Sequence, residues 1–282
     1  METDSFKLSQ EELDILAEQI IEEETATLST VEIPVFYLVG AQPGSGKTEI
    51  IHLIRNELRG NVLICNVDDL RDRHPAHIEI LKNHEADYPD ITWSCANYWN
   101  TSLKHYGVKH RLNILIETTL QDLKLVTNEF RNMKRNGYLT NLLVLAVPAR
   151  SSWLGTKLRY EVVKEKAGVA RPVSDEAHDI RFDKLQENLP QLINSGDVDL
   201  LRLFKREVTV EHCASSALVQ LTTSREDFYE RYNDVVLKAI DTAGLADYFT
   251  TGARVIELMK KRRASQEEID LFNISFNEKL QG

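Results

Sequence analysis

Cysteine is scarce in this sequence of 282 residues, which contains only Cys65, Cys95 and Cys213. Their number is odd and they are widely separated, so we expect neither a disulfide framework nor a Cys-x-x-Cys metal site. A chain that does not depend on disulfides suits a reducing compartment.

Long hydrophobic runs are also missing. No stretch approaches the roughly 18 apolar residues that a membrane-spanning helix needs. The N-terminal segment METDSFKLSQEELD is acidic and lacks the apolar centre of a signal peptide. We therefore expect a cytoplasmic protein without membrane contacts.

Basic residues are outnumbered, with 34 Lys and Arg against 44 Asp and Glu and a formal net charge of -10. A general nucleic-acid binder presents a broad basic surface, and this balance argues against one. Any basic site must be local. Internal repeats and Pro/Gly-rich linkers are absent too, and 42% hydrophobic residues are enough for a core. We expect a single domain over residues 1–282.

Five short apolar runs alternate with stretches of helical periodicity. The runs cover residues 35–39, 62–65, 113–116, 142–147 and 198–204. This alternation predicts an α/β fold with a parallel sheet and helices on both of its faces. Ligands of such sheets bind at the carboxyl ends of the strands, so the residues after each run are expected to line one crevice.

Helices are expected at both ends of the chain. Ser9 and Glu12 form a capping-box pattern at the start of an amphipathic helix. The apolar positions of this helix are Leu13, Leu16, Ala17, Ile20 and Ile21. From about residue 225 the pattern is helical, with apolar positions Tyr229, Tyr232, Val235, Val236 and Ile240.

The first apolar run is followed by the glycine-rich segment AQPGSGKT. It fits the end of a phosphate-binding loop, although Ala41 stands where the pattern has its first glycine. Glycines let the backbone N–H groups turn toward phosphates, and the following helix points its positive end at them. The expected phosphate-binding residues are Gln42, Pro43, Gly44, Ser45, Gly46, Lys47 and Thr48. Lys47 would reach the β- and γ-phosphates, and Thr48 would ligate Mg²⁺. The alternative is a chance glycine turn, which the strand before and the helix after it disfavour.

Carboxylates follow the next two runs. Asp68 and Asp69 come after the second run, which places them beside the phosphate loop if the first two strands are neighbours. A carboxylate there can accept a proton from a substrate hydroxyl or hold Mg²⁺. Alternatively, one of them caps a helix that begins at Leu70. Glu117 and Thr118 follow the third run and are expected to hold substrate hydroxyls or a metal-bound water, although Glu117 could instead pair with a structural arginine.

Two arginines belong to the stretch after the fourth run. Arg159 and Arg171 lie in or beside a mixed helical segment, and bidentate guanidinium groups neutralise the charge of a phosphoryl group in transfer. On a mobile segment they would also exclude water from the site. The alternative for each is a solvated surface charge.

Five separated segments have the order and spacing of one known family: GAQPGSGKT, GNVLICNVDDLRDRHP, NILIETT, LAVP with WLGTKLRYE, and VARPVSDEAHDI. On these residues the chain resembles the zeta toxin family, the kinase half of epsilon/zeta toxin–antitoxin pairs. The resemblance covers roughly residues 5–215. It implies a P-loop kinase core there and leaves 216–282 as a C-terminal helical extension.

The resemblance implies an activity. Members transfer the γ-phosphoryl group of ATP or GTP, with Mg²⁺, to the 3'-hydroxyl of the amino sugar in UDP-N-acetylglucosamine, a cell-wall precursor. Lys47 and Thr48 match the family's nucleotide and magnesium residues. Asp68 matches its general base.

Three further residues match. Glu117 corresponds to the family acid that binds sugar-nucleotide hydroxyls, and Arg159 and Arg171 to the two arginines that grip the phosphates. The family also implies an antitoxin partner. We predict that it blocks the access of nucleotide near residues 40–48.

The chain departs from the family at three positions. Asn66 replaces the first acid of a D-x-D-like pair, Thr118 a glycine, and Gln121 a basic residue. Without a basic residue at position 121, the protein loses a charge-assisted hydrogen bond to the acceptor. Such a bond contributes about 1.5–3 kcal/mol. The acceptor therefore stays open between UDP-N-acetylglucosamine, another UDP-sugar and NAD. A non-catalytic ATP-binding module is the alternative outside enzymes, and it would hold nucleotide without turnover.

Other features allow two interpretations each. The aromatic side chains Trp93, Tyr98 and Trp99 either pack in the core or stack on a base of the acceptor. His178 and Asp179 are expected to orient a nearby loop, and the alternative is a catalytic dyad. The basic run Lys260–Arg263 is either a contact of a C-terminal helix or a solvated face.

Overall fold

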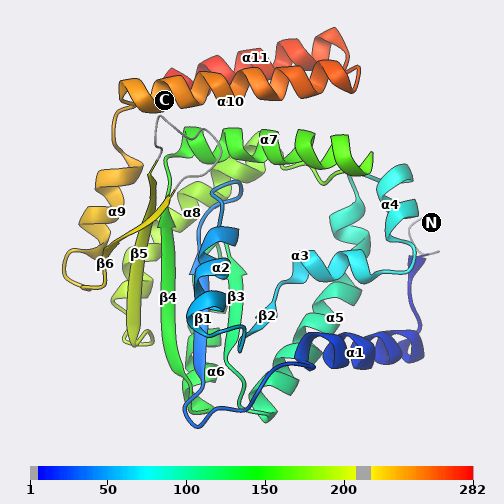
Figure 1. Ribbon diagram of the computed structural model, residues 1–282, viewed down its shortest axis with the longest axis vertical. Coiled ribbons are helices and arrows are strands. Elements are labelled where there is room, and N and C mark those ends of the chain that lie inside the picture. Colours follow the sequence, from blue (N-terminus) through cyan, green and yellow to red (C-terminus); the bar gives the residue numbers. More distant parts are fainter. Residues whose placement is uncertain (1–5, 208–216, 282) are drawn as a thin grey trace.

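A six-stranded sheet forms the centre of the computed structural model, which describes residues 6–207 and 217–281 (Figure 1). The strands are β1 (Val35–Gly40), β2 (Leu63–Cys65), β3 (Ile114–Thr118), β4 (Leu139–Ala146), β5 (Leu200–Glu207) and β6 (Ala217–Thr222). Their order is β2-β3-β1-β4-β5-β6. The first five run parallel, which confirms the five predicted strands.

Strand β6 was not predicted from the sequence. It pairs antiparallel with β5 at the edge of the sheet. Its sequence ALVQLT is short and broken by a glutamine, so it lacks the continuous apolar pattern of the buried parallel strands. The predicted helical extension therefore begins with a strand of the sheet.

Helices surround the sheet and account for most of the remaining chain. They are α1 (Gln10–Thr25), α2 (Thr48–Glu57), α3 (Val67–Leu70), α4 (His77–Asn83), α5 (Tyr88–Lys109), α6 (Leu123–Arg135), α7 (Ala149–Ala167), α8 (Asp175–Ile193), α9 (Phe228–Val236), α10 (Thr242–Lys261) and α11 (Gln266–Gln281). The predicted capping box of the first helix is present, with Ser9 and Glu12 bonded reciprocally. Ile240 lies between α9 and α10 and not in a helix.

Two apolar layers cover the two faces of the sheet, as predicted. One packs α2, through Ile50 and Ile54, against Val39 and its neighbours. The other contains residues of α1, α5, α6, α8 and α9, including Ile20, Phe130 and Tyr232. Because both faces are covered, ligands must approach the sheet at the ends of its strands.

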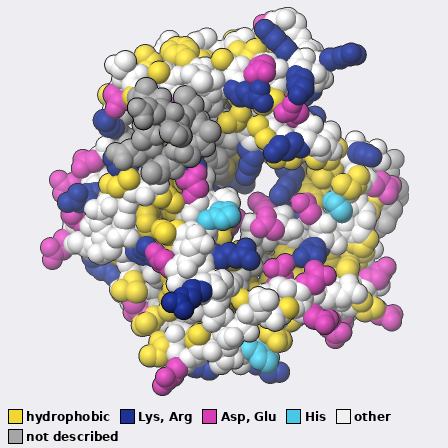
Figure 2. All heavy atoms as spheres, in the orientation of Figure 1, with side chains coloured by type: hydrophobic (Ala, Val, Ile, Leu, Met, Phe, Trp, Pro, Cys, Tyr) yellow, Lys and Arg dark blue, Asp and Glu magenta, His cyan; other side chains and the backbone are white. Residues whose placement is uncertain are grey.

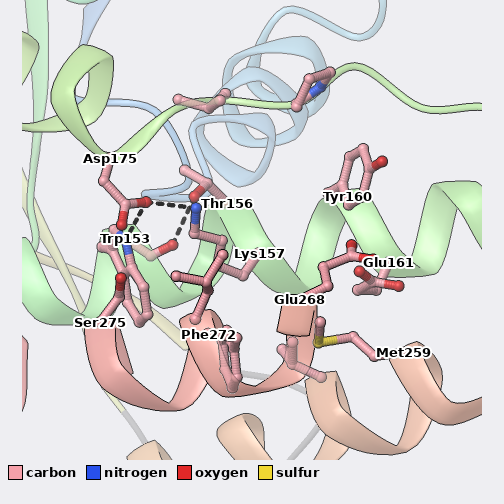
Figure 3. Close-up of a pocket in the computed structure, with 14 residues that line it drawn as sticks. Trp153, Thr156, Lys157, Tyr160, Glu161, Asp175, Met259, Glu268, Phe272 and Ser275 are labelled. Atoms are coloured by element: carbon pink, nitrogen blue, oxygen red, sulfur yellow. Dashed lines mark hydrogen bonds and ion pairs between the residues drawn. The ribbon is translucent and has the colours of Figure 1, made fainter. Parts of the chain in front are cut away.

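A third apolar cluster joins α7 to the last two helices, which lie over it at the top of Figure 1. Trp153 of α7 is fully buried and stacks on Phe272 of α11, with ring centroids 5.9 Å apart. A pocket of about 300 Å³ opens beside this stack, and Figure 3 shows Lys157 and Asp175 at its rim.

The basic run Lys260–Arg263 is a contact between helices. Arg262 binds both carboxylate oxygens of Glu161 in α7, at 2.7 and 2.8 Å, and Lys261 pairs with Glu165. The first of the two interpretations therefore holds for Lys261 and Arg262, whereas Lys260 and Arg263 are exposed.

Cys65 and Cys95 are buried free thiols, and burial raises the pKa of Cys65 to about 12. Cys213 lies outside the described residues.

Within residues 6–207 and 217–281, every helix is too short or too polar to cross a membrane.

Candidate functional site

The molecule is hollowed where the carboxyl ends of the strands face α7 and α3. Figure 2 shows this hollow, with Lys and Arg side chains on the α7 side and Asp and Glu side chains on the α3 side. The opposite charges agree with the expectation of a local basic site in an acidic protein.

The phosphate loop leads from β1 into α2, as predicted. Gly44 and Gly46 have φ angles of +75° and +88°, which favour glycine, whereas Ala41 has no positive φ. The alanine therefore does not disturb the loop. Gly40 is required for another reason, because a Cβ atom there would lie 2.6 Å from the Leu120 side chain.

The loop contains a buried polar group without a partner. Ser45 is 1% exposed, and its hydroxyl has no hydrogen-bond partner among the residues that the structure describes. An unsatisfied buried hydroxyl costs free energy. The oxygen of a bound phosphate would accept its hydrogen, so the loop fits a phosphate group.

Lys47 lies folded over its own loop. Its ammonium group donates to the carbonyl oxygens of Ala41 and Gln42, at 3.0 and 3.2 Å. Burial lowers the pKa of Lys47, while the charges of Glu117 and Asp68 oppose this shift. The cation is thus placed between the loop and two carboxylates, Asp68 after β2 and Glu117 at the end of β3.

Asp68 lies at this site although the strand that precedes it is not the neighbour of β1. The prediction placed it beside the phosphate loop if the first two strands were neighbours, but β3 lies between β1 and β2. Nor does Asp68 or Asp69 cap a helix that begins at Leu70. The helix α3 begins at Val67, and its N-cap is Asn66, which accepts from the Asp68 backbone N–H at 3.0 Å.

Two arginines hold the Asp68 carboxylate. Arg71 Nε donates to Asp68 Oδ1 at 2.9 Å, and Arg171 Nη1 lies 3.4 Å from the same oxygen and 3.0 Å from the Asp68 carbonyl. Burial raises the pKa of Asp68, but Arg171 and Arg71 outweigh it and lower the pKa below its ordinary value. The carboxylate is therefore ionised at neutral pH.

Arg71 was not identified from the sequence. It is 6% exposed and also donates to Thr92 Oγ1 in α5 at 3.0 Å. Its position three residues after Asp68 was the available signal, since i,i+3 neighbours of opposite charge meet on a helical turn. That signal is weak, because NVDDLRDR contains three acids and two arginines and so allows more than one pairing.

Glu117 lies at the end of β3, close to Asn66. The Asn66 amide donates to Glu117 Oε1, and also to Asp69 Oδ2 at 3.0 Å. Burial raises the pKa of Glu117, and the Lys47 charge opposes it. Burial also raises the pKa of Asp69. The asparagine that departs from the family pattern thus connects Asp69 of α3 with Glu117 of β3.

The turn after Glu117 is strained. Leu120 is 1% exposed and has a φ of +57°, a region that branched residues rarely adopt. Thr118 accepts from its backbone N–H at 3.2 Å, and Asn188 donates to the Leu120 carbonyl at 2.8 Å. Gln121 is exposed. Strain of this kind persists only where the surroundings enforce it.

Arg159 projects from α7 toward the same groups. Its charge interacts with those of Arg171, Asp68 and Glu117. Its side chain is exposed. The structure therefore brings together the predicted residues Lys47, Asp68, Glu117, Arg159 and Arg171, from five separate parts of the chain.

Helix α7 also touches the phosphate loop, which the sequence did not predict. A Cβ atom on Gly155 would lie 2.3 Å from the Gly44 carbonyl oxygen, and one on Gly44 would lie 2.0 Å from the Ser152 carbonyl oxygen. Both contacts involve backbone atoms, so the loop and the helix approach as closely as glycine permits.

The aromatic residues of α5 do not share one role. Trp99 is fully buried and donates to the Leu13 carbonyl at 3.0 Å, so it belongs to the core. Tyr98 bonds to Asp14 of α1. Trp93 is 52% exposed, with the Arg71 guanidinium 5.5 Å from its ring centroid. Of the three, Trp93 alone is open to stacking on a ligand.

A magnesium ion fits the site in one way. Thr48 is the first residue of α2, and Mg²⁺ typically binds one or two protein oxygens together with substrate phosphates and water. The described residues contain no group of three or more His, Cys, Asp or Glu side chains arranged for a metal. A site completed by phosphates agrees with that finding.

Known proteins resemble this chain along most of its length. The family model for zeta toxin matches residues 18–216. The toxin zeta of Enterococcus hirae is 32% identical over 188 residues, which are 66% of this chain and 66% of the relative. The toxin PezT of Streptococcus pneumoniae serotype 4 is 29% identical over 175 residues, covering 62% and 69%. The chain spans about two thirds of the length of these relatives.

Solved structures share the fold. A chain from the PezAT chromosomal toxin–antitoxin system of Streptococcus pneumoniae superposes with a TM-score of 0.74 at 20% identity, covering 90% of this chain and 98% of that one. A chain of the AvrRxo1-ORF1:AvrRxo1-ORF2 complex with sulphate ions has a TM-score of 0.54 at 12% identity, covering 93% and 84%. The α/β prediction of a P-loop-type sheet is confirmed. By the match of the family model to residues 18–216, the chain belongs to the zeta toxin family.

Proposed function

We propose that the protein is a kinase that transfers the γ-phosphoryl group of ATP or GTP to a sugar hydroxyl of UDP-N-acetylglucosamine, the 3'-hydroxyl of its amino sugar. The observation that carries this proposal is the meeting of Lys47, Asp68 and two arginines in one hollow. Phosphoryl transfer requires these parts: a phosphate-binding cation, a base for the acceptor and charges around the transferred group.

The phosphate loop binds the nucleotide in this proposal. The backbone of residues 42–48 surrounds the phosphates, and Lys47 leaves its two carbonyl partners for their oxygens. Thr48 would hold Mg²⁺, and the ion would supply positive charge next to the phosphates. The unpartnered Ser45 hydroxyl gains an acceptor.

Asp68 serves as the base. Because its pKa is lowered, it is ionised and able to accept the proton of the attacking hydroxyl. Arg71 and Arg171 fix the position of its carboxylate. A positioned base is effective only within hydrogen-bond reach of the proton that it takes.

The remaining residues divide between the two substrates. Arg159 and Arg171 stabilise charge on the transferred group from the α7 side of the hollow. Glu117 and Thr118 bind hydroxyls of the acceptor. Asn66 orients the Glu117 carboxyl for this task by donating to Oε1.

Proteins of similar fold support two parts of the proposal, the nucleotide substrate and the antitoxin partner. One solved structure of similar fold is the AvrRxo1-ORF1:ORF2 complex with ATP, with a TM-score of 0.51. The PezAT neighbour is a toxin–antitoxin system. We infer that an antitoxin covers the region of residues 40–48 in this protein and competes with nucleotide.

The test is phosphoryl transfer by the purified protein with Mg²⁺ and ATP or GTP. The acceptors are UDP-N-acetylglucosamine, other UDP-sugars and NAD, and the product is read by mass. We expect one added phosphate on UDP-N-acetylglucosamine. Lys47→Ala is expected to abolish the transfer, and Asp68→Asn to lower its rate by a factor of about 100 or more while nucleotide still binds. Asp234→Asn, at an exposed position of α9, is the matched control.

Other outcomes are informative. Transfer to another acceptor of the panel would show that the acceptor pocket differs from the one that the family implies. Nucleotide binding without any transfer would contradict the kinase proposal and favour a binding module. Full transfer by Asp68→Asn would exclude Asp68 as the base.

A further inference from the structure

A chain of hydrogen bonds connects α11 with the phosphate loop. Lys279 of α11 donates to both oxygens of Asp179 at 2.6 Å, and Asp179 Oδ1 lies 3.0 Å from His178 Nδ1. His178 Nε2 lies 2.9 Å from Ser152 Oγ, which in turn accepts from the Gln42 amide at 3.1 Å. The chain thus joins the C-terminal helix to the second residue of AQPGSGKT.

The direction of each bond follows from the groups at its ends. The Asp179 carboxylate only accepts, so His178 Nδ1 carries a hydrogen. In the neutral imidazole Nε2 is then an acceptor, and the Ser152 hydroxyl donates to it. Ser152 keeps a lone pair for the Gln42 amide. With a neutral histidine, each bond of the chain has one donor and one acceptor. Two groups lie outside this match: Gln42 Oε1 is buried without a partner among the described residues, and the Ala149 carbonyl, 3.0 Å from Ser152 Oγ, is a second acceptor for the serine hydroxyl.

Water does not compete for the central bonds. Gln42, Ser152 and His178 are each 0% exposed. Buried hydrogen bonds are stronger than exposed ones, and a partner lost from such a network leaves the others unsatisfied.

The Gln42 end of the chain bears directly on the phosphate loop. The Gln42 carbonyl accepts from the Lys47 ammonium group at 3.2 Å and from the Ser45 backbone N–H at 3.4 Å. The Gln42 amide is held by Ser152 and by the Val147 carbonyl, at 2.7 Å from the latter. Fixing this side chain therefore fixes the carbonyl against which the proposed phosphate-binding lysine lies.

We propose that Ser152 and His178 are positioning residues that hold Gln42, and with it the phosphate loop, in the geometry that binds nucleotide, and that Lys279 connects this chain to α11. The inference rests on the proposed nucleotide-binding function. It gives the C-terminal helices, which lie outside residues 18–216 of the family match, a role at the site.

The charges around His178 support the neutral form that the chain needs. Asp179, Asp175 and Lys279 are the charged groups that act on it. Burial lowers the pKa of His178, Asp179 opposes this, and Lys279 adds to the lowering. Without the Lys279 charge, the pKa of His178 would rise.

Two substitutions of His178 separate positioning from packing. In His178→Gln the side-chain amide reaches the place of Nε2 and can still accept from Ser152. In His178→Asn the shorter amide keeps the contact with Asp179 but not the one with Ser152. We expect His178→Asn and Ser152→Ala to weaken the binding of Mg²⁺–ATP about three- to tenfold, the effect of one net hydrogen bond. His178→Gln should stay within about twofold of the unchanged protein.

The double variant Ser152→Ala/His178→Asn provides an independent measure. If both residues act through one contact, it loses no more affinity than either single variant. Additive losses, equal losses in His178→Gln and His178→Asn, or unchanged affinity in both single variants would overturn the inference. If the unchanged protein binds no Mg²⁺–ATP, the proposed function itself fails, and this inference falls with it.

The connection to α11 is read separately by the NMR titration of the His178 ring nitrogens. Lys279→Met should move the midpoint of this titration to higher pH. Lys238→Met is the matched control, because Lys238 forms an exposed pair with Asp241 at 3.0 Å. A midpoint that Lys279→Met leaves unchanged would overturn the role of Lys279.

Discussion

The pKa values of three carboxyl groups in the hollow are shifted in different directions, although the groups lie close together. The pKa of Asp68 is lowered, whereas burial raises those of Asp69 and Glu117. Asp68 differs because two arginines contact it. Such a separation assigns different roles to neighbouring acids, with the ionised one suited to accept a proton.

Removal of Arg71 should change the pH dependence of the proposed transfer. In Arg71→Met the Asp68 carboxylate loses a cation that favours its ionised form, so the pKa of Asp68 rises toward its ordinary value. Since Asp68 acts when ionised, the activity at acid pH falls first, and the acid limb of kcat/KM moves to higher pH. The measurement is a profile of kcat/KM from neutral pH downward.

Arg73→Met is the matched control for this profile. Arg71 and Arg73 both belong to a short 3₁₀ helix, Arg71–Arg73, but Arg73 pairs with Glu23 and Glu24 of α1, at 2.6 and 3.0 Å. Its removal should leave the acid limb in place. An unchanged limb in Arg71→Met would mean that Arg71 does not set the charge state of Asp68.

Individual site residues were predictable where the local sequence carries the chemistry. The glycine-rich loop identified Lys47, and the positions after buried strands identified Asp68 and Glu117. Arg71 and Ser152 were not found because their roles depend on partners that only the fold brings near. The same holds for Trp99, whose spacing allowed both core packing and stacking until the contact with α1 decided for the core.

Helix α7 connects the site with the C-terminal helices. One side of it carries Arg159 and touches the phosphate loop through Gly155, while Glu161 faces α10. Glu161 is 4% exposed, and both of its oxygens accept from Arg262. A buried carboxylate depends on such a partner, because its desolvation is costly.

Arg262→Met should therefore destabilise the protein strongly. It leaves the Glu161 carboxylate buried and unpaired, and removal of one partner of a buried ion pair costs about 3–5 kcal/mol. Arg254→Met on the same helix is the control, because Arg254 and Glu257 form a pair of exposed side chains, 48% and 65% exposed, and such pairs contribute about 1 kcal/mol or less. Urea unfolding of both variants measures the difference. Equal losses would mean that Glu161 finds solvent or another donor.

The elements were predicted better than their arrangement. Near-continuous apolar runs identified the five parallel strands, because strands buried on both faces have little polar content. The order of strands did not follow, since it depends on crossovers between distant segments, and β3 separates β1 from β2. Strand β6 was not predicted because it lies at the edge of the sheet, where a strand needs no continuous apolar run.

Across the whole molecule, charge and packing separate the site from its support. The net charge of -10 is distributed over the surface, while cations gather on one side of the hollow. The hollow is bounded by α7, and α7 is itself covered by α10 and α11. A division into a core over 5–215 and an extension over 216–282 remains a prediction, and the packing of α7 argues that the two parts depend on each other.

A chain that ends at Ala239, without α10 and α11, tests this dependence. Trp153 and Leu154, now 0% and 2% exposed, would face water. Exposing two such side chains costs about 3–6 kcal/mol, a large part of the roughly 5–15 kcal/mol by which a domain is stable. We expect Tm to fall by at least about 6 °C, and the binding of Mg²⁺–ATP to weaken because Lys279 is lost with α11. Phe272→Ala in the full chain removes only the ring stacked on Trp153 and should give an intermediate Tm. A shortened chain with unchanged Tm and unchanged nucleotide affinity would show instead that the core folds and binds without its C-terminal helices.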